Sequence, residues 1–379
     1  MINQRGIGMK KLRGIIQFGL TFILLNGLLL FVGWNGWEWL KNSFGFCYLF
    51  VYWFIYGIVA YSFLLGRLSK YLSFLRTVGN IWFGFFQYAV LLLPIADIII
   101  LLLKWGTGHV STTAILIAGL AIIFSIALLF GIGIYNAYSP VIRKYEITVP
   151  KKNSKLSTLR IAMASDMHFG RLSGVAHLEN LIKNIQGIQP DIILLPGDII
   201  DDELEPFIQK NMGEMMGELT ASLGVYGVLG NHEYYGRQIP QFIQQMNQIH
   251  IKILMDEVLT IDESFHLLGR KDKTDKDRKS FEELLTEIDR SLPIIAMDHQ
   301  PSEIKQAREN GVDVLFSGHT HRGQMAPNHL ITRKMFELDW GYLHKDQLHA
   351  FVSSGYGFWG PPMRLASRSE ILQIDICFT

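Results

Sequence analysis

Hydrophobic residues are concentrated in the first third of the chain, in four long segments that are nearly free of charge. They span residues 14–33, 47–66, 81–103 and 114–137. At about 1.5 Å per helical residue, each is long enough to cross a hydrocarbon core roughly 30 Å thick. We therefore expect a four-span transmembrane domain in residues 1–137. No convincing small-residue cleavage site follows the first span, so we expect it to be retained and not removed as a signal peptide.

The pattern changes after about residue 155, where short apolar runs end in polar loops and alternate with helical stretches. Such alternation predicts an α/β domain in residues 156–379, with helices covering the faces of a sheet. We expect strands at 159–164, 191–195, 225–229, 251–254, 265–268, 293–297, 312–316, 350–353 and 371–376. Residues 138–155, which contain Pro140 and Pro150, are expected to be a linker. The mixed-charge segment 270–280 is expected to be a solvated loop.

Basic residues are distributed unequally among the loops between the expected spans. Only Lys41 and Lys104 fall in the two loops that we place outside. The others lie before the first span, between the second and third, and after the fourth: Arg5, Lys10, Lys11, Arg13, Arg67, Lys70, Arg76, Arg143, Lys144, Lys151, Lys152 and Lys155. The positive-inside rule therefore predicts a multi-pass protein of the cell membrane, with the N-terminus and the α/β domain in the cytoplasm.

Composition adds little to this picture. Of 379 residues, 49% are hydrophobic and 18% charged, and the net charge of +1 gives no reason to expect a nucleic-acid partner. The two cysteines are far apart, so no disulfide framework is expected. Asp97 lies inside the third span; it is either a functional residue of the membrane region or close enough to the interface to be wetted.

Five of the expected strands are followed by residues of types that commonly bind metals in proteins. They are followed by the stretches "SDMHFG", "PGDIID", "GNHEYYG", "DHQP" and "SGHTHRGQ". An open α/β sheet places its ligand site at the carboxyl ends of its strands. The candidate ligands at these ends are Asp166, His168, Asp198, Asn231, His299, His319 and His321.

These residue types suit a pair of divalent ions. Two cations about 3.5–4 Å apart repel, so a bridging carboxylate is needed, and we expect Asp198 to be that bridge. A set rich in histidine with two carboxylates disfavours magnesium and calcium and suits manganese, iron, zinc or cobalt. Of these, we expect manganese first.

The series D-x-H, G-D, G-N-H-E, H and G-H-x-H, in this order and after these strands, resembles the calcineurin-like metallophosphoesterases over residues 159–379. The tail "SSGYGFWGPPMRLASRSEI" is similar to that of their membrane-associated bacterial subgroup, the YkuE-like and YaeI-like enzymes and lipid A pathway hydrolases. This resemblance implies two packed sheets flanked by helices. Asp298 before the lone histidine and Arg322 in the last block depart from the common pattern.

The resemblance also implies roles for individual residues. One metal would be held by Asp166, His168, Asp198 and His321, and the other by Asp198, Asn231, His299 and His319. His232 would contact the substrate phosphate and assist the leaving group. Independently of the resemblance, we expect Glu233 to orient its neighbours and Asp201 and Asp202 to be solvated. We expect hydrolysis of a phosphoester or pyrophosphate bond by a metal-bridging hydroxide.

Four spans close to such a domain favour a lipid-linked substrate. Three alternatives stay open: a phosphodiesterase of a soluble nucleotide, a metal-binding sensor without turnover, and a transporter in which Asp97 is the working residue. The complete set of expected ligands and His232 favour an enzyme over a sensor. A single intramembrane acid makes transport the weakest of the three.

Overall fold

A computed structural model describes residues 2–150 and 153–379. Lys151 and Lys152, and the side chains of Arg5, Lys10, Lys11 and Lys70, lie outside this description. The chain divides into two compact units, Met1–Phe130 and Gly131–Thr379, each described by itself.

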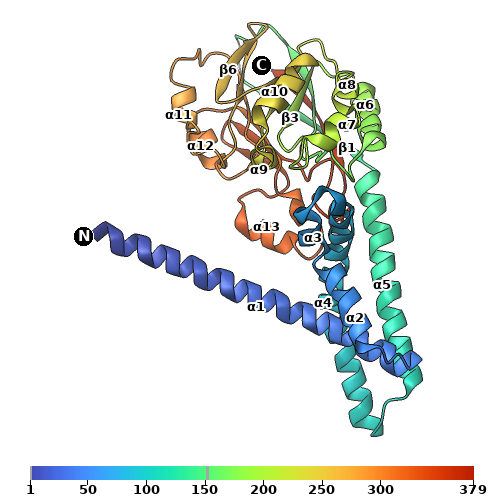
Figure 1. The fold of residues 1–379 in the computed structure, drawn as a ribbon. Helices are drawn as coiled ribbons and strands as arrows, with labels where there is room; N and C mark the ends of the chain where they lie inside the picture. Colours follow the sequence, from blue (N-terminus) through green and yellow to red (C-terminus); the bar gives the residue numbers. More distant parts are fainter. Residues whose placement is uncertain (1, 151–152) are drawn as a thin grey trace. The chain divides into compact units, whose positions relative to one another are not determined.

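The first unit is helical, as expected. Its elements are α1 (Ile2–Phe44), α2 (Leu49–Ala60), α3 (Ser62–Leu68), η1 (Lys70–Leu72), α4 (Phe74–Thr107) and the beginning of α5 (Thr112–Tyr138) (Figure 1). Three helical stretches are long and apolar enough to cross a membrane: Arg13–Phe44, Phe74–Thr107 and Thr112–Tyr138. The α2–α3 pair is bent by 68° and makes a fourth span if it crosses as one. The second span that we expected is therefore broken near Tyr61.

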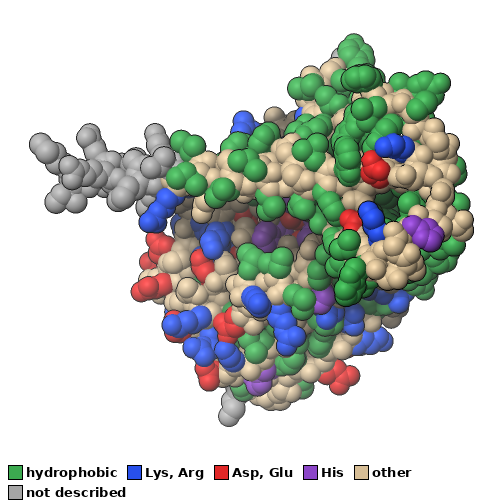
Figure 2. Space-filling model, turned by 90° about the horizontal axis from the view of Figure 1, so that it is seen from below, with side chains coloured by type: hydrophobic (Ala, Val, Ile, Leu, Met, Phe, Trp, Pro, Cys, Tyr) green, Lys and Arg blue, Asp and Glu red, His purple; other side chains and the backbone are tan. Residues whose placement is uncertain are grey.

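Many apolar side chains of these helices are exposed, including Phe18, Phe50, Leu101 and Phe124. Hydrophobic side chains spread over the helical unit, whereas Lys, Arg, Asp and Glu are more frequent on the other unit (Figure 2). Exposed apolar surface on this scale is typical of helices whose solvent is lipid.

The second unit contains two six-stranded mixed sheets. The first has the strand order β1-β12-β2-β3-β4-β5 and the second β10-β11-β9-β8-β7-β6. The strands of the first sheet are β1 (Val141–Val149), β2 (Thr158–Met163), β3 (Ile192–Pro196), β4 (Val225–Val228), β5 (Ile251–Ile253) and β12 (Glu370–Phe378). Those of the second are β6 (Glu257–Ile261), β7 (Phe265–Gly269), β8 (Ile294–Met297), β9 (Val314–Ser317), β10 (Gly341–Lys345) and β11 (Leu348–Val352).

Helices pack on the outer faces of both sheets. The first sheet is covered by α6 (Val175–Ile188), α7 (Glu205–Gln209), α8 (Met212–Met216) and α10 (Ile239–Gln248), and the second by α11 (Phe281–Leu284) and α12 (Ile304–Glu309). The short helices α9 (Asn231–Gly236), η2 (His321–Gly323) and α13 (His329–Met335) follow strand ends or loops. A buried apolar layer joins the inner faces of the sheets, with Ile161 and Leu194 from the first and Met297 and Phe316 from the second. Two packed sheets flanked by helices confirm the expected α/β class.

Part of the expected linker is a strand. Residues 141–149 form β1, which pairs in parallel with β12 from Val141↔Glu370 to Val149↔Phe378. The alternation of exposed and inward-facing positions in β1 explains why the segment is a strand: Ile147 and Val149 reach the core, while Glu146 and Thr148 stay exposed. Our linker interpretation gave too much weight to the prolines and charges.

The expected solvated loop at 270–280 is partly buried. Arg270 Nη1 donates to Asp298 Oδ2 at 2.9 Å and to Glu303 Oε2 at 2.8 Å, and Arg278 also bonds Asp298. Asp272 is fully buried and accepts a bond from Gln300. The opposite charges pair with one another, and so the loop packs against the segment that carries His299.

Candidate metal centre

The strand ends singled out in the sequence meet at one place. Neighbouring parallel strands β2, β3 and β4 bring together the residues that follow them, and the parallel pair β8 and β9 does the same in the second sheet. Several of these residues adopt left-handed backbone conformations, with φ of 52° at Asp166, 51° at Asp198 and 69° at His319. Such conformations are unusual outside glycine and gather at functional sites.

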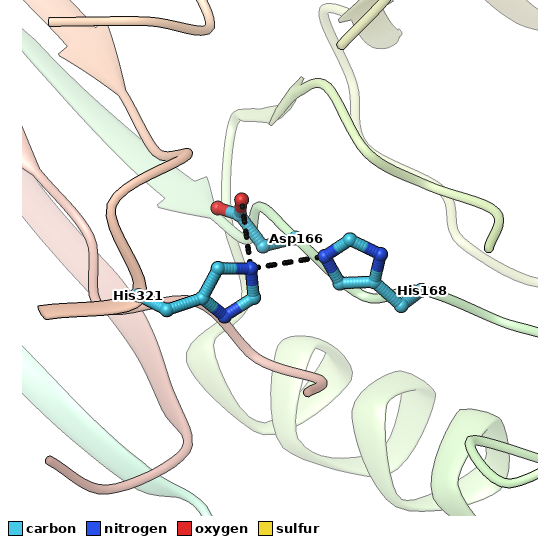
Figure 3. Close-up of side chains that lie close together, drawn as sticks. All are labelled: Asp166, His168 and His321. Atoms are coloured by element: carbon cyan, nitrogen blue, oxygen red, sulfur yellow. Dashed lines mark hydrogen bonds and ion pairs between the residues drawn. The ribbon is translucent and has the colours of Figure 1, made fainter. Parts of the chain in front are cut away.

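Asp166, His168 and His321 form one buried cluster (Figure 3). His321 Nε2 lies 3.0 Å from His168 Nε2 and 3.5 Å from Asp166 Oδ1. Burial lowers the pKa of both His168 and His321 well below the usual value, so both rings are neutral near pH 7. Two neutral imidazole nitrogens and a carboxylate oxygen facing one another are well suited to a shared cation.

Asp198, His299 and His319 form a second cluster, and Asn231 lies inside it. Asn231 Oδ1 is 2.8 Å from His319 Nδ1 and 3.2 Å from His299 Nε2. The other ring nitrogen of His299 lies 2.8 Å from the carbonyl oxygen of Pro196, to which it can donate. This bond turns His299 Nε2 toward the cluster, as a metal ligand requires.

Asp198 lies between the two clusters. Its Oδ2 is 3.2 Å from His299 Nε2 and 3.8 Å from His168 Nε2. Burial alone would raise the pKa of Asp198, but the charge and hydrogen bond of His299 outweigh burial and hold it well below the usual range. Asp198 is therefore an ionised carboxylate within reach of both clusters.

His232 stands beside the first cluster. Its ring centroid is 4.6 Å from that of His168, and its backbone N–H donates to Asp198 Oδ1 at 2.9 Å. His232 Nδ1 lies 2.8 Å from Asp202 Oδ1 and 3.7 Å from Asp201 Oδ1. Burial alone would lower the pKa of His232, but the bond to Asp202 and the neighbouring carboxylates raise it to about 9. His232 is therefore protonated at neutral pH.

Asp201 and Asp202 are half-buried beside His232, which differs from the solvated positions that we expected. Their sequence position, shortly after Asp198, could have indicated this placement. The turn that presents Asp198 also carries the residues that follow it.

The side chain of Glu233 accepts hydrogen bonds from backbone N–H groups next to the site. Its carboxylate accepts N–H bonds from Asp198 at 3.1 Å, Ile200 at 3.0 Å and Gly230 at 2.7 Å. It therefore fixes the turn that carries Asp198 and the start of α9, which agrees with the orienting role that we expected.

Two glycines allow these loops to approach one another. A Cβ at position 230 would lie 2.1 Å from Asp198 Oδ1, and one at position 318 would lie 2.1 Å from Asp166 Oδ2. Any larger residue at either place would displace a candidate ligand.

The residues that the sequence placed together are thus together in the fold, and the donor set of imidazoles, carboxylates and one amide fits divalent transition metals. The sequence profile of calcineurin-like phosphoesterases matches residues 159–323, a range that contains all seven candidate ligands and His232. A metallophosphoesterase of Helicobacter pylori is 30% identical over 262 residues, which cover 67% of this chain and 69% of that protein. The chain belongs to the calcineurin-like metallophosphoesterase family.

Two further relatives of this metallophosphoesterase have names that refer to a transmembrane protein and to a diacylated sugar nucleotide. A transmembrane protein with metallophosphoesterase domain from Danio rerio is 29% identical over 64% of this chain. The matched part spans 59% of the Danio rerio protein. The UDP-2,3-diacylglucosamine pyrophosphatase LpxG of Chlamydia trachomatis is 23% identical, over 59% of this chain and 85% of that protein.

The sequence did not identify Arg364 as a residue of the metal centre. Arg364 is fully buried, donates to the Gly357 carbonyl, and has Nη2 3.2 Å from His321 Nδ1. It lies 43 positions after His321. No local pattern links the two, so only the fold reveals the contact.

Proposed function

We propose that this chain is a membrane-anchored hydrolase of phosphoester or pyrophosphate bonds that binds two divalent ions, manganese first among them. One ion would be held by Asp166, His168, Asp198 and His321, and the other by Asp198, Asn231, His299 and His319. The observation that carries the proposal is the position of Asp198 Oδ2, within 3.8 Å of a nitrogen in each cluster.

Bound metals would supply positive charge to the phosphoryl oxygens and lower the pKa of water. The residues of the chain then have separate tasks. His232 is protonated, and because its Nδ1 faces Asp202, Nε2 is the nitrogen that donates a proton to the leaving oxygen. Glu233 holds the backbone of Asp198 in place. Gly230 lets the loops after β3 and β4 approach each other, and Gly318 does the same for the loops after β2 and β9.

The substrate that we propose is lipid-borne. Apolar helices that are long enough to span a bilayer precede the metal centre, and the relative LpxG is named as a pyrophosphatase of a diacylated sugar nucleotide. The exposed aromatic rings of Trp359 and Tyr235 lie 6.5 Å and 5.7 Å from the His232 ring. Such a rim suits an amphipathic substrate, because aromatic rings favour the membrane interface.

We further propose that residues 1–137 serve as the membrane anchor and that the metal centre faces the cytoplasm. Arg143, Lys144 and Lys155 follow the last span, and cytoplasmic loops are enriched in such residues. Basic residues beside a bilayer attract anionic headgroups by roughly 1 kcal/mol each.

A direct comparison of substrates tests the proposal. The full chain, reconstituted in nanodiscs with manganese, would be assayed on a pyrophosphate-linked glycolipid, on lipid phosphates and on soluble phosphodiesters. We expect faster turnover of a lipid-borne substrate, with the Asp198→Asn variant as the inactive control. Equal turnover of lipid and soluble substrates would remove the lipid proposal and favour the soluble nucleotide phosphodiesterase.

The alternative of a metal-binding regulator without turnover is tested in cells. His232→Ala removes the proposed proton donor and leaves the seven candidate ligands. If cells that carry this variant kept the full physiological effect of the protein, the regulator would be favoured over the enzyme.

A further inference from the structure

Helix α13 presents an apolar face that the second unit does not cover. Leu330, Ile331 and Met335 are 55%, 59% and 68% exposed, and no residue of α13, which is described in full, is buried. Ile331 and Met335 lie one helical turn apart, and Lys334 lies between them and Leu330 around the helix. We call Leu330, Ile331, Arg333, Lys334 and Met335 the α13 face.

The position of α13 is fixed by polar bonds and not by a hydrophobic core. Thr332 on its opposite side donates to Asp339 Oδ2 at 2.7 Å, and Thr320 donates to the Asp339 carbonyl at 2.6 Å. None of the described core clusters includes Leu330, Ile331 or Met335. In Figure 1, α13 stands outside both sheets. The apolar residues of α13 therefore do not stabilise the folded core, and another role must explain their presence.

Both ends of α13 lead into the metal centre. Helix η2, which contains His321, comes shortly before it, and the ring of Phe336 directly after it lies 6.2 Å from the His319 ring. A contact that fixes the position of α13 would therefore also fix one edge of the metal centre.

A chain of hydrogen bonds connects this edge to the end of the last candidate span. Asn136 in the final turn of α5 donates to the Arg364 carbonyl, and the Arg364 N–H donates to the Gly133 carbonyl. The next residue, Leu365, donates to the Gln324 carbonyl and accepts from Ala326, a few residues before α13. The end of a membrane helix and the start of α13 are thus fastened within one compact unit.

We propose that the α13 face docks onto the surface of the bilayer that contains the chain's own helices. Its three apolar side chains enter the boundary between headgroups and acyl chains, and Arg333 and Lys334 bind anionic headgroups. Basic and apolar residues on one helical face are the composition of interfacial helices, and α13 contains no acid. This inference rests on the membrane association in the proposed function and is independent of the reaction.

Site-specific fluorescence on the full chain tests the proposal. The exposed cysteines are first replaced by Cys47→Ser and Cys377→Ser, and a bimane label is then attached to Ile331→Cys or, separately, to Met335→Cys. The matched control is Ile208→Cys, an exposed isoleucine of α7. Each protein is placed in nanodiscs of phosphatidylcholine and phosphatidylglycerol, with either doxyl-labelled lipid or aqueous iodide as the quencher.

We expect doxyl lipid to quench the label at 331 and 335 and not at 208, and iodide to quench only at 208. Equal quenching of all three labels by iodide would overturn the proposal. Protection at 331 and 335 from both quenchers would overturn it too, because it would assign the face to a protein partner or a second copy. The readout does not use turnover, so failure of the proposed reaction and failure of α13 docking are distinguishable.

Discussion

At the scale of single residues, environment gives neighbouring histidines in and beside the first cluster different charge states. His168 and His321 are held neutral by burial, whereas His232 is held protonated by Asp202 and its neighbours. Neutral imidazole binds metal ions and imidazolium donates protons. One residue type therefore performs two tasks within a few ångströms.

The role of His232 predicts how its loss depends on the substrate. We expect His232→Gln to lower kcat by about 10²–10⁴-fold for a substrate with a poor alkoxide leaving group, the range that positioned proton transfer contributes. A substrate that releases p-nitrophenolate needs little protonation and should lose much less. Steady-state kinetics on both substrates measures the difference. His250→Gln, at an exposed histidine, is the matched control. Equal losses on both substrates would contradict proton donation.

His177, which lies outside the candidate metal ligands, predicts a pH effect on stability. Burial and then the charge of Arg364 lower its pKa to about 4 from about 6.5. The unfolded state therefore binds more protons below pH 6.5, so the free energy of unfolding falls as pH drops from about 6.5 toward 4, by up to about 3 kcal/mol.

His177→Phe keeps the stacking on Tyr356, whose ring centroid is 4.4 Å away, and removes the titrating group. We expect denaturant unfolding of the variant to depend less on pH between 4 and 6.5 than that of the parent chain. Contributions of the metal centre are common to both proteins and cancel in the comparison. Identical slopes would show that His177 is not a source of acid sensitivity.

At the scale of elements, short turns after strands position most of the residues of the site. Asp198 and Glu233 come from the ends of adjacent strands β3 and β4, and Glu233 binds the backbone of both turns. The relative position of Asp198 and Glu233 therefore depends on the pairing of β3 with β4.

Glu233 should accordingly be needed for stability. Glu233→Ala leaves three buried N–H groups without their acceptor, at about 1–3 kcal/mol for each group, so we expect a loss of at least about 3 kcal/mol. Glu233→Gln keeps one acceptor oxygen and should lose less. Denaturant unfolding of metal-free protein measures both. Glu205→Ala, at an exposed glutamate in the first turn of α7, should change stability by less than about 0.5 kcal/mol.

The sequence predicted the elements that have strong local patterns. Apolar runs located β2, β3, β4, β8 and β9, and the polar residues after them marked the site, because the ends of parallel strands must meet. It could not predict the pairing of β1 with β12, which joins Arg143 and Glu370 across 227 positions. Nor did local charge reveal that Arg270 is buried, because its partners Asp298 and Glu303 come from another segment.

At the scale of the whole molecule, metal binding and membrane insertion are the two properties that the proposed function requires together. Each can be measured on the full chain without knowledge of the substrate.

Metal binding should depend on the shared carboxylate. We expect the parent chain to bind two manganese ions per chain, His299→Gln to bind fewer, and Asp198→Asn to lose both, because both proposed sites use Asp198. Elemental analysis after dialysis gives the stoichiometry. Chelation should also lower the melting temperature of the parent, since manganese at 100 times its Kd would stabilise a site by about 2.7 kcal/mol. Unchanged binding in Asp198→Asn would exclude it as the bridge.

Orientation in the membrane is predicted by the distribution of basic residues. A green fluorescent protein fused after Thr379 should fluoresce, and alkaline phosphatase at the same place should be inactive, because both report a cytoplasmic location. Fusion after Gly108, between α4 and α5, should give the opposite result. Matching results at the two positions would contradict the proposed topology.

The pairing of β1 with β12 has a consequence for how the protein is made. β1 comes directly after a helix that enters the bilayer early, yet its partner strand is translated much later. During synthesis the nascent chain must hold an unpaired strand beside the translocation machinery, where an open edge can recruit another polypeptide. Biogenesis of this protein should therefore depend on chaperones that shield β1 until the partner strand emerges from the ribosome.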